Sequence, residues 1–430
     1  MGRRLIEGVR ITGCTVGPSV PTVGPVEDGG TIVLETAPGC WGPMITPELD
    51  GGHEITEPVA VQGATTGDAV AVKIRRITVT SKASASGTGV PVEGTRERKG
   101  GKTVRMCPGC QEEFPATVLQ GIGENAIICS RCGCPAIPYR ITSGYTVVLD
   151  QDQGVAVTVV GKAAEEIARR ADAFAALPPT SRQHSILSLA VADLPGGILT
   201  RMRPFIGNLG TTPAMDISAS ANCGDFGQGL RDGGLTDEEF AQLTDGHLDA
   251  DSVREGAILI CPVKVDGAGI YAGDVHAMQG DGEIAGHTTD VSAQISLQVE
   301  VIKGLHIEGP LLLPPVEDLP FLARPFCSKE LQAGRELASK WGVTIEEALP
   351  IQVVGSGPDL NAATENGLER AAALLDMDVN EIKNRVTLSG AVEIGRAPGL
   401  VLVSLLAPME QLRALGLEGL VREQYELPVG

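Results

Sequence analysis

A glycine-rich segment of the chain concentrates ionisable side chains at spacings that suit metal chemistry. Residues 273–283 read Gly-Asp-Val-His-Ala-Met-Gln-Gly-Asp-Gly-Glu and contain four such side chains within ten positions: Asp274, His276, Asp281 and Glu283. Alternate side chains of an extended strand point to the same side, so we expect the first two to face together and the last two likewise. The three glycines indicate sharp turns or a close backbone approach.

An upstream segment repeats the arrangement, with His247 and Asp249 two positions apart. Imidazole and carboxylate groups that leave positions open for water suit a divalent cation such as Zn²⁺ or Mn²⁺, which activates water for attack. A neighbouring carboxylate such as Glu283 could then serve as general base. By residue type alone, the same acidic and glycine residues fit a solvated surface loop equally well.

Two Cys-x-x-Cys pairs form a second chemical pattern, Cys107 with Cys110 and Cys129 with Cys132. Two residues between thiolates let both sulfur atoms face one tetrahedral ion from a tight turn, and a second pair completes a four-cysteine site. The spacing predicts a structural zinc ribbon, whose closed coordination shell leaves no position for catalysis. The alternative, a redox dithiol, lacks the βαβ setting of such motifs, and Cys134 could replace Cys132 as a ligand.

A cysteine nucleophile is a separate alternative, and Cys223 in the polar segment 220–225 is its best candidate. Burial as a small apolar residue is the more ordinary role of such a cysteine. The chain contains no Walker phosphate-binding motif, no dinucleotide fingerprint after a strand and no Gly-x-Ser-x-Gly elbow.

The elements that must position these residues are mostly strands. Apolar alternation predicts strands in the first 90 residues and between about 198 and 313, where Val291–Val301 is the clearest example. Residues 81–98, rich in Ser, Gly, Thr and charge, predict a loop or linker, and residues 162–176 predict a helix. From Ser328 onward, helical periodicity at 330–340, 361–375 and 380–386 alternates with short apolar strands.

We expect four parts, because 430 residues exceed one ordinary core. Aromatic residues are only 3% of the chain, against 55 Gly and 28 Pro, which favours short strands and tight turns over a helical bundle. The predicted parts are an N-terminal β part of the body (1–98), a zinc-ribbon insertion (99–140), a central β part with the ionisable cluster (141–320) and an α+β C-terminal lobe (321–430).

Charge and hydropathy limit the partners and the compartment. The formal net charge is −20, and a field of that sign repels nucleic-acid phosphates and anionic lipid. No signal-peptide apolar region and no run of about 18 apolar residues occurs. We therefore expect a soluble cytoplasmic protein that binds neither nucleic acid nor membrane, and cysteines that bind metal fit that reducing compartment.

Four segments, in order, resemble sequence elements of the acetamidase/formamidase family. Residues 53–70 resemble its TGP-x-x-V-x-GA-x-x-GD element, and residues 204–214 resemble its G-x-IG-x-x-PA loop. Residues 245–263 resemble GGN-x-D followed by L-x-x-G-x-x-L-x-x-PV, and residues 273–283 contain every fixed letter of GD-x-H-x-x-QGDGE. On these four matches the chain is identified as a member of the family, with weaker similarity toward the C-terminus.

The resemblance implies a fold, a reaction and a set of site residues. The family is similar to a β-sandwich with additional α+β structure, is usually oligomeric, carries divalent metal and hydrolyses short carboxamides to the acid and ammonia. We therefore expect a mainly β fold, with a β-sandwich body, and a homo-oligomer. Carried over position by position, six residues become candidates for the metal and catalysis: Asp249, Asp274, His276, Gln279, Asp281 and Glu283.

Two features of the chain depart from the family pattern. Where the family has Gly-Gly-Asn-x-Asp, this chain has Asp-Gly-His-Leu-Asp at 245–249, so an imidazole replaces an amide at His247. The change could add a metal ligand or alter what the pocket accepts. The cysteine-rich insertion is also outside the family pattern. These two departures affect the prediction of the substrate more than the prediction of the reaction class.

The sequence thus predicts metal-assisted hydrolysis of a small carboxamide such as formamide or acetamide. Beside the structural zinc of the ribbon, a second divalent metal is predicted (zinc first, calcium or manganese as alternatives), with the ligands His247, Asp249 and His276. Glu283 or Asp274 would take the proton from water and pass it to the leaving ammonia. The full set of predicted catalytic residues is Glu283, Asp274, Asp281 and Gln279.

Two alternative functions remain open at the level of sequence. One is a non-catalytic or divergent relative whose zinc ribbon mediates subunit or partner assembly. The other is an amidase that acts on a larger, specialised amide.

Overall fold

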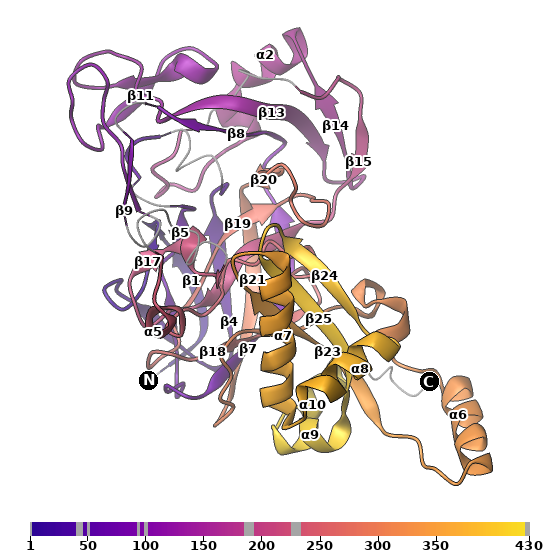
Figure 1. Cartoon of the computed structure of the whole chain (residues 1–430). Helices are drawn as coiled ribbons and strands as arrows, with labels where there is room; N and C mark the ends of the chain where they lie inside the picture. Colours follow the sequence, from indigo (N-terminus) through magenta and orange to yellow (C-terminus); the bar gives the residue numbers. More distant parts are fainter. Residues whose placement is uncertain are drawn as a thin grey trace.

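The structure is a computed structural model that describes residues 2–39, 46–49, 52–92, 95–98, 102–184, 193–224 and 234–425. The chain is mainly β, with 37% strand and 21% helix, and this confirms the predicted fold class. The longer helices lie in the C-terminal region (Figure 1). Within the described ranges, no helix combines the length and the apolar character that crossing a membrane requires.

The main sheet contains 15 strands among the described residues. In chain order they are β1 (Arg3–Val9), β2 (Ile11–Gly13), β4 (Val23–Thr36), β5 (Ile55–Thr56), β6 (Val59–Val61), β7 (Ala69–Val79), β16 (Phe205–Thr211), β18 (Ile258–Pro262), β19 (Ile270–His276), β20 (Asp290–Val291), β21 (Ala293–Ile302), β22 (Leu311–Leu313), β23 (Ala348–Ser356), β24 (Ala391–Arg396) and β25 (Leu400–Pro408).

Smaller sheets and the helices complete the fold. A four-stranded sheet consists of β8 (Ala83–Pro91), β13 (Tyr139–Asp150), β14 (Val155–Val159) and β15 (Leu199–Arg201). Three strand pairs are β3 (Thr15–Val16) with β17 (Ile217–Ser218), β9 (Arg96–Arg98) with β10 (Lys102–Val104), and β11 (Thr117–Leu119) with β12 (Ile127–Cys129). The α-helices are α2 (Lys162–Ala168), α3 (Ala171–Phe174), α5 (Asp237–Phe240), α6 (Ser328–Lys340), α7 (Leu360–Leu375), α8 (Val379–Ser389), α9 (Met409–Ala414) and α10 (Glu418–Tyr425).

The main sheet is continuous from the N-terminal strands to the C-terminal region. Its strand order is β2-β5-β19-β6-β4-β21-β7-β18-β22-β23-β25-β24, and β16 and β20 both pair with β19. Pairing is antiparallel except where β1 and β6 run parallel to β4. The C-terminal strands therefore extend the same sheet through β22, and β19, which carries part of the predicted site, is hydrogen-bonded on both sides.

Two hydrophobic cores lie on opposite faces of this sheet. In β7, Val70 and Val72 enter the first core, whereas Ala69 and Ala71 enter the second. This follows from the two-residue period of a strand, which sends successive side chains to opposite faces. The second core also contains buried residues of α7 to α10, so the C-terminal helices cover one face of the sheet.

Several predicted elements are confirmed and two are wrong. The predicted C-terminal helices correspond to α6, α7 and α8, and the strand predicted at 291–301 corresponds to β20 and β21. The predicted linker at 81–98 instead contains β8, which pairs along β13, and β9; residues 93 and 94 lie outside the described residues. The small side chains of Ala83 and Ala85 let β8 pack in a tight core. The single helix predicted at 162–176 is two short helices, α2 and α3.

One buried carboxylate fixes the turn before β7. Asp68 accepts hydrogen bonds from the amide and hydroxyl of Thr65 and from the Gly304 amide, each at 2.9 Å, and it pairs with Lys303. Burial raises the pKa of Asp68, but the hydrogen bonds from Lys303 and from the amides outweigh burial and hold the pKa below its usual range. The interaction ties the start of β7 to the end of β21.

Replacement of this carboxylate should destabilise the fold. Asp68→Asn should lower the free energy of unfolding by about 2 kcal/mol, because a buried acceptor becomes a donor that faces donors. Because the folded-state pKa is depressed, this contribution is present above about pH 4 and is lost as the pH falls below that value. Urea denaturation across pH measures it, and the control is the exposed Asp266→Asn, which retains an amide oxygen as acceptor for Thr66 and should change the free energy of unfolding by less than about 0.5 kcal/mol. A constant difference between Asp68→Asn and wild type down to pH 3 would contradict this account.

Candidate active site

The predicted ionisable residues converge on β19 and on segments that lie beside it. β19 itself supplies Asp274 and His276, and its antiparallel partner β16 places Phe205 opposite His276. The segment with His247 and Asp249 is joined to β16 by a bridge between His247 and Asn208. Segments far apart in the sequence therefore meet at β19, which is labelled in Figure 1.

Asp274 is the centre of the cluster. Its Oδ1 lies 2.9 Å from His276 Nε2, and its Oδ2 lies 2.9 Å from His53 Nδ1 and 3.5 Å from His247 Nε2. The side chains of Asp274 and His276 are each only 1% exposed. One buried carboxylate thus contacts three imidazoles, which come from three separate segments of the chain.

Two further aspartates surround these imidazoles. Asp249 Oδ2 lies 2.9 Å from His247 Nε2, and Asp290 Oδ1 lies 3.4 Å from His276 Nε2. Asp290 is held by hydrogen bonds from the hydroxyls of Ser84, to its carbonyl, and Ser86, to its carboxylate. The strand β8, which the sequence reading missed, therefore supports the site directly.

Backbone geometry at the site differs from that of a regular strand. Asp249, Asp274 and Glu283 have φ angles of 44°, 55° and 43°, in the left-handed region that non-glycine residues rarely occupy. Two glycines let the backbone approach the carboxylates closely. A Cβ at Gly39 would lie 1.6 Å from Asp274 Oδ1, and a Cβ at Gly207 would lie 2.3 Å from Asp249 Oδ1. Local strain of this kind concentrates at functional sites, where surrounding contacts offset it.

The hydrogen bonds around two imidazoles fix which nitrogen faces the cluster. Gln279 donates from Nε2 to the Asp249 carbonyl at 2.7 Å, so its Oε1 faces His276 Nδ1, which donates to it at 3.1 Å. His247 Nδ1 lies 2.7 Å from the carbonyl oxygen of Ser220 and donates to it. In both residues Nε2 therefore points to the carboxylates, in the arrangement typical of metal-ligating histidines, whose other nitrogen is held by a hydrogen bond.

The electrostatics of the cluster favour positive charge. Burial lowers the pKa of His276, but the carboxylates of Asp274 and Asp290 outweigh burial and raise that pKa to about 10. Burial, together with the charge of Asp249, raises the pKa of Glu283 to about 8, and burial is also the main cause that raises the pKa of Asp290 to about 6.

Arg396 from β24 is the permanent cation of the cluster. Its Nε lies 3.4 Å from Asp249 Oδ2, and its Nη1 lies 3.0 Å from His247 Nδ1. Its Nη2 also donates to Cys223 Sγ at 3.1 Å, so this buried cysteine lies at the edge of the cluster. Asp225, the last residue of the segment around Cys223, lies outside the described residues.

The cluster could hold divalent metal. Two groups of three residues bring their ligand atoms within 4.8 Å of one another: His53, His247 and Asp274, and Asp249, Asp274 and His276. Buried carboxylate oxygens also remain for a cation, since Asp249 Oδ1 and Asp290 Oδ1 accept no hydrogen bond from the described residues. Carboxylate oxygens and imidazole nitrogens are ligands of zinc and related ions, so these residues fit a divalent cation.

The structure brings most of the predicted site residues together but not all of them. His247, Asp249, Asp274, His276 and Gln279 contact one another directly. Glu283 is buried close enough for Asp249 to influence its pKa, whereas Asp281 is exposed and lines a separate cavity of about 200 Å³. The prediction that Asp281 and Glu283 point to the same side is wrong, because positive φ angles at Gly282 and Glu283 turn the backbone between them.

Three residues of the cluster were not predicted: His53, Asp290 and Arg396. His53 stands at the start of a family-like element, but its isolation in the sequence gave no sign of a ligand. Asp290 follows the motif segment without a recognisable spacing. Arg396 comes from the C-terminal region, where the sequence carries no motif that connects it with the site.

The four predicted ribbon cysteines also form one cluster. Their sulfur atoms lie within 4.8 Å of one another, with 3.4 Å between Cys107 and Cys132 and 3.9 Å between Cys110 and Cys129. Cys134 is not part of this group, although its sulfur lies 2.6 Å from where a Cβ at Gly109 would be. The group could hold one metal ion.

The segment predicted to form the ribbon contacts residues that precede His53 of the ionisable cluster. Arg105, which is 2% exposed, donates from Nη1 to the carbonyls of Thr46 (3.1 Å) and Leu49 (2.7 Å). Thr117 donates from its amide and hydroxyl to Glu48 Oε1, at 2.8 and 2.9 Å. The ribbon therefore holds residues 46–49, a few positions before His53.

Comparison with known proteins identifies the class and the family. Residues 17–244 and 240–412 match the sequence profile of the Acetamidase/Formamidase family. The chain is therefore an amide hydrolase that acts on C–N bonds. It belongs to the acetamidase/formamidase family.

Solved structures show the same fold. A predicted acetamidase/formamidase from Thermoanaerobacter tengcongensis matches with a TM-score of 0.53 and 18% identity, over 96% of this chain and 98% of that chain. An acetamidase from Bacillus halodurans matches with a TM-score of 0.53 and 16% identity, over 96% of this chain and 99% of that chain. A comparison with curated proteins gives no significant sequence match.

Proposed function

We propose that the chain hydrolyses a small carboxamide, of formamide or acetamide size, at a site for two divalent cations that share Asp274. The observation that carries this proposal is the pair of ligand groups around one carboxylate. His53 and His247 lie near Asp274 Oδ2, whereas His276 lies near Asp274 Oδ1 with Asp249 beside it. A bridging carboxylate with imidazoles on both sides is suited to two neighbouring ions.

His247 completes one of these ligand groups. Its Nε2 faces both Asp249 and Asp274, and its Nδ1 is occupied by the Ser220 carbonyl. An imidazole is a stronger ligand for zinc-like ions than the amide found at this position in the family pattern. We therefore assign the departure at His247 to metal binding.

Amide hydrolysis requires charge stabilisation and a proton carrier. His53, His247, Asp249, Asp274 and His276 would hold the divalent cation, which would supply Lewis-acid polarisation of the amide carbonyl and a more acidic water. Glu283 is buried beside the cluster, burial raises its pKa to about 8, and it belongs to neither group of potential metal ligands. In its deprotonated form, the Glu283 carboxylate would take a proton from the attacking water and then deliver that proton to the amide nitrogen, so that the C–N bond breaks and the acid and ammonia leave.

Gln279 acts as a positioning residue. Its side chain holds the Nδ1 of His276 and the carbonyl of Asp249 together, as described above. This bridge opposes rotation of the His276 ring, which would move its Nε2 away from Asp274. Asp281, which lies outside the cluster, has no role in this proposal.

Asn208 is suited to recognise the substrate amide. It is fully buried on β16 between Gly207 and Leu209, opposite Gly273 of the motif, and it is bridged to His247. Neither its Nδ2 nor its Oδ1 has a hydrogen-bond partner in the described part of the chain. A buried carboxamide without partners is costly, and a substrate carboxamide supplies both the matching donor and the matching acceptor.

The proposed reaction is tested by ammonia release combined with metal analysis. Purified protein should release ammonia from formamide or acetamide and should carry divalent metal beyond the ribbon ion. His276→Ala should lose this additional metal and at least about 100-fold in kcat/KM, while the matched control His306→Ala, at an exposed position, retains both. Screening larger carboxamides in parallel tests the alternative of a specialised amide. Protein with a full complement of metal that cleaves no carboxamide, or an active His276→Ala, would refute the proposal.

Substitution of Asn208 separates recognition from folding. Asn208→Leu removes two unpartnered polar atoms at similar volume, so it should raise the free energy of unfolding by about 1–2 kcal/mol. The same variant should raise KM for the amide by at least about 100-fold, since the polar contacts to the substrate are lost. Thermal unfolding and steady-state kinetics measure both. A destabilised variant with unchanged KM would show that Asn208 has only a structural role.

We propose zinc as the ion of the ribbon. Four thiolates match the structural zinc sites of proteins. Burial raises the pKa of Cys107, but hydrogen bonds from the Cys110 amide and from Cys132 outweigh burial and lower that pKa to about 7, which favours the thiolate that zinc requires. The ribbon's contacts with residues 46–49 make it a support for the active site.

Loss of the ribbon contact should impair catalysis without removing the zinc. Arg105→Ala frees residues 46–49 and so loosens His53, which should lower kcat/KM about 10- to 100-fold. The ribbon cysteines should remain protected from thiol reagents, which shows that their ion is still bound. The control is Arg131→Ala, at a ribbon arginine that is 68% exposed and pairs with Glu112. Wild-type activity in Arg105→Ala would show that the ribbon does not support the site.

A further inference from the structure

A fifth cysteine lies beside the four ribbon cysteines. Cys134 does not belong to that group, and only Gly133 separates it from Cys132. A Cβ at Gly109 would lie 2.6 Å from the sulfur of Cys134 and 3.0 Å from the sulfur of Cys132. Both sulfur atoms therefore face the same glycine, and the distance between them cannot exceed the sum of these two lengths. Because Gly109 has no side chain, the two sulfur atoms share the space beside it.

The two cysteines occupy one tight turn. Gly133 has a φ angle of 75°, and this left-handed conformation suits glycine. Its amide donates to the Cys129 carbonyl at 3.0 Å, and the Cys129 amide donates to the Cys134 carbonyl at 2.9 Å. The amide of Cys134 also donates to the sulfur of Cys132. The α-carbons of residues two positions apart are separated by at most about 7 Å, and a turn shortens this distance into the range of roughly 4.4–6.8 Å that disulfides usually have.

Cys132 is the most accessible of the four proposed zinc ligands. Cys107 and Cys129 are buried and Cys110 is partly exposed, whereas Cys132 is exposed and its neighbour Cys134 is partly exposed. An oxidant in solution therefore reaches Cys132 first. Redox-sensitive cysteines combine thiolate character, solvent access and an adjacent second thiol. A bound zinc ion would hold Cys132 as a thiolate, and Cys134 is the adjacent thiol.

We propose that Cys132 and Cys134 form a peroxide-reactive pair, and that a disulfide between them releases the ribbon ion. This inference rests on the zinc ribbon proposed above. The Cys132 thiolate attacks hydrogen peroxide, whose O–O bond breaks, so that a sulfenic acid forms on Cys132 and hydroxide leaves. The Cys134 thiol then attacks this sulfur. The S–S bond forms, the S–OH bond breaks, and the hydroxyl leaves with the Cys134 proton as water. Peroxide thus gains two electrons from two sulfur atoms, and Cys132 can no longer serve as a ligand.

The ribbon also contacts a second segment that leads toward His53. Thr117 Oγ1 lies 2.8 Å from His184 Nε2. In the same segment as His184, the Ser181 hydroxyl donates to Glu54 Oε2 at 2.6 Å. Glu54 directly follows His53 and is fully buried. The ribbon therefore holds the chain on both sides of His53, through the contacts before it described above and through Glu54 after it.

The geometry of these contacts depends on the ribbon ion. Thr117 is paired with Cys129 in the strand pair of β11 and β12, and Arg105 stands just before the first ribbon cysteine. Among the described residues, the hydrophobic cluster at the cysteines adds only Ala136 to them, so the shape of the ribbon depends on the bound ion. After oxidation both contacts should loosen and His53 should be less firmly placed, which should lower kcat/KM about 10- to 100-fold.

Peroxide treatment of the zinc-loaded protein tests this inference. Wild type should release one zinc ion per chain to a chromogenic chelator, and mass spectrometry of the digested protein should find a disulfide between Cys132 and Cys134. Amidase activity should fall in step with the release of zinc. Dithiothreitol with added zinc should restore the activity, because a disulfide is a reversible oxidation product.

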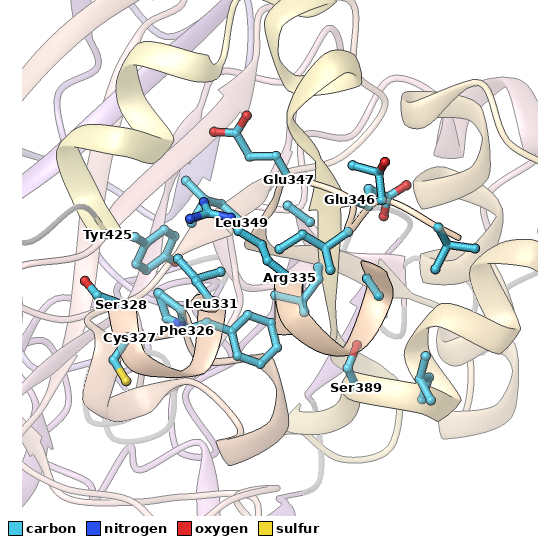
Figure 2. A pocket seen from close by; sticks show the side chains of 18 of the residues that line it. Phe326, Cys327, Ser328, Leu331, Arg335, Glu346, Glu347, Leu349, Ser389 and Tyr425 are labelled. Atoms are coloured by element: carbon cyan, nitrogen blue, oxygen red, sulfur yellow. The ribbon is translucent and has the colours of Figure 1, made fainter. Parts of the chain in front are cut away.

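Two serine variants identify the second thiol of the pair. Cys134→Ser removes a cysteine outside the ligand group, so its zinc content and basal activity should equal those of wild type. Peroxide should inactivate this variant without forming the disulfide, and dithiothreitol should fail to restore it, because a sulfenic acid without a partner thiol proceeds to irreversible sulfinic acid. The matched control Cys327→Ser should behave as wild type. Cys327 is another exposed cysteine, and it lines the cavity beside α6 that Figure 2 shows.

Three results would each overturn the inference. They are zinc retained by the fully oxidised protein, a disulfide that joins Cys132 to a cysteine other than Cys134, and a Cys134→Ser variant that dithiothreitol restores. The disulfide and the released zinc are both measured without an amide substrate. A protein that shows both but hydrolyses no carboxamide would therefore refute the proposed reaction and still support the peroxide-reactive pair.

Discussion

The contact between one buried carboxylate and three imidazoles determines the architecture of the proposed active site. Asp274 lies inside the main sheet, where an isolated charge would be strongly destabilising. Its two oxygens are contacted by His53, His247 and His276, and Gly39 leaves the space that the carboxylate occupies. The left-handed backbone at Asp274 directs the side chain to this position, and the surrounding contacts offset the strain of that conformation.

The charged groups around Asp274 are also explained by the cost of a carboxylate charge in the buried interior. Since several carboxylates cannot remain charged together in a dry interior, the cluster also contains Arg396 and imidazoles held by hydrogen bonds on their outer nitrogens. Burial, together with the charge of Asp249, raises the pKa of Glu283, whereas for His276 the surrounding carboxylates outweigh burial and raise the pKa. The same group of buried carboxylates therefore explains both the proposed cation site and the raised pKa of Glu283, the proposed proton carrier.

Sequence reasoning predicted the parts of this molecule that depend on local spacing. The ribbon cysteines, the pairing of His247 with Asp249 and of Asp274 with His276, and the C-terminal helices all follow from separations of two to four residues. His53, Asp290 and Arg396 could not be predicted, because they reach the site through strand pairings between distant segments. Asp281 and Glu283 were misplaced relative to each other because the turn between them depends on φ angles that the extended-strand assumption does not include. The strand β8 was missed because its Ala, Ser and Gly residues resemble a linker until they pack against β13.

The assembly of the site from β5, β19 and β24 has a consequence for the order in which the protein matures. In the order of synthesis His53 comes first, Asp249 and Asp274 follow about 200 residues later, and Arg396 comes more than 100 residues after these. The strand that carries Arg396, β24, joins the edge of the main sheet by pairing with β25. A nascent chain therefore contains the four-cysteine segment long before the cluster around Asp274 is complete, and the cluster, once formed, links segments of the chain that are more than 300 residues apart.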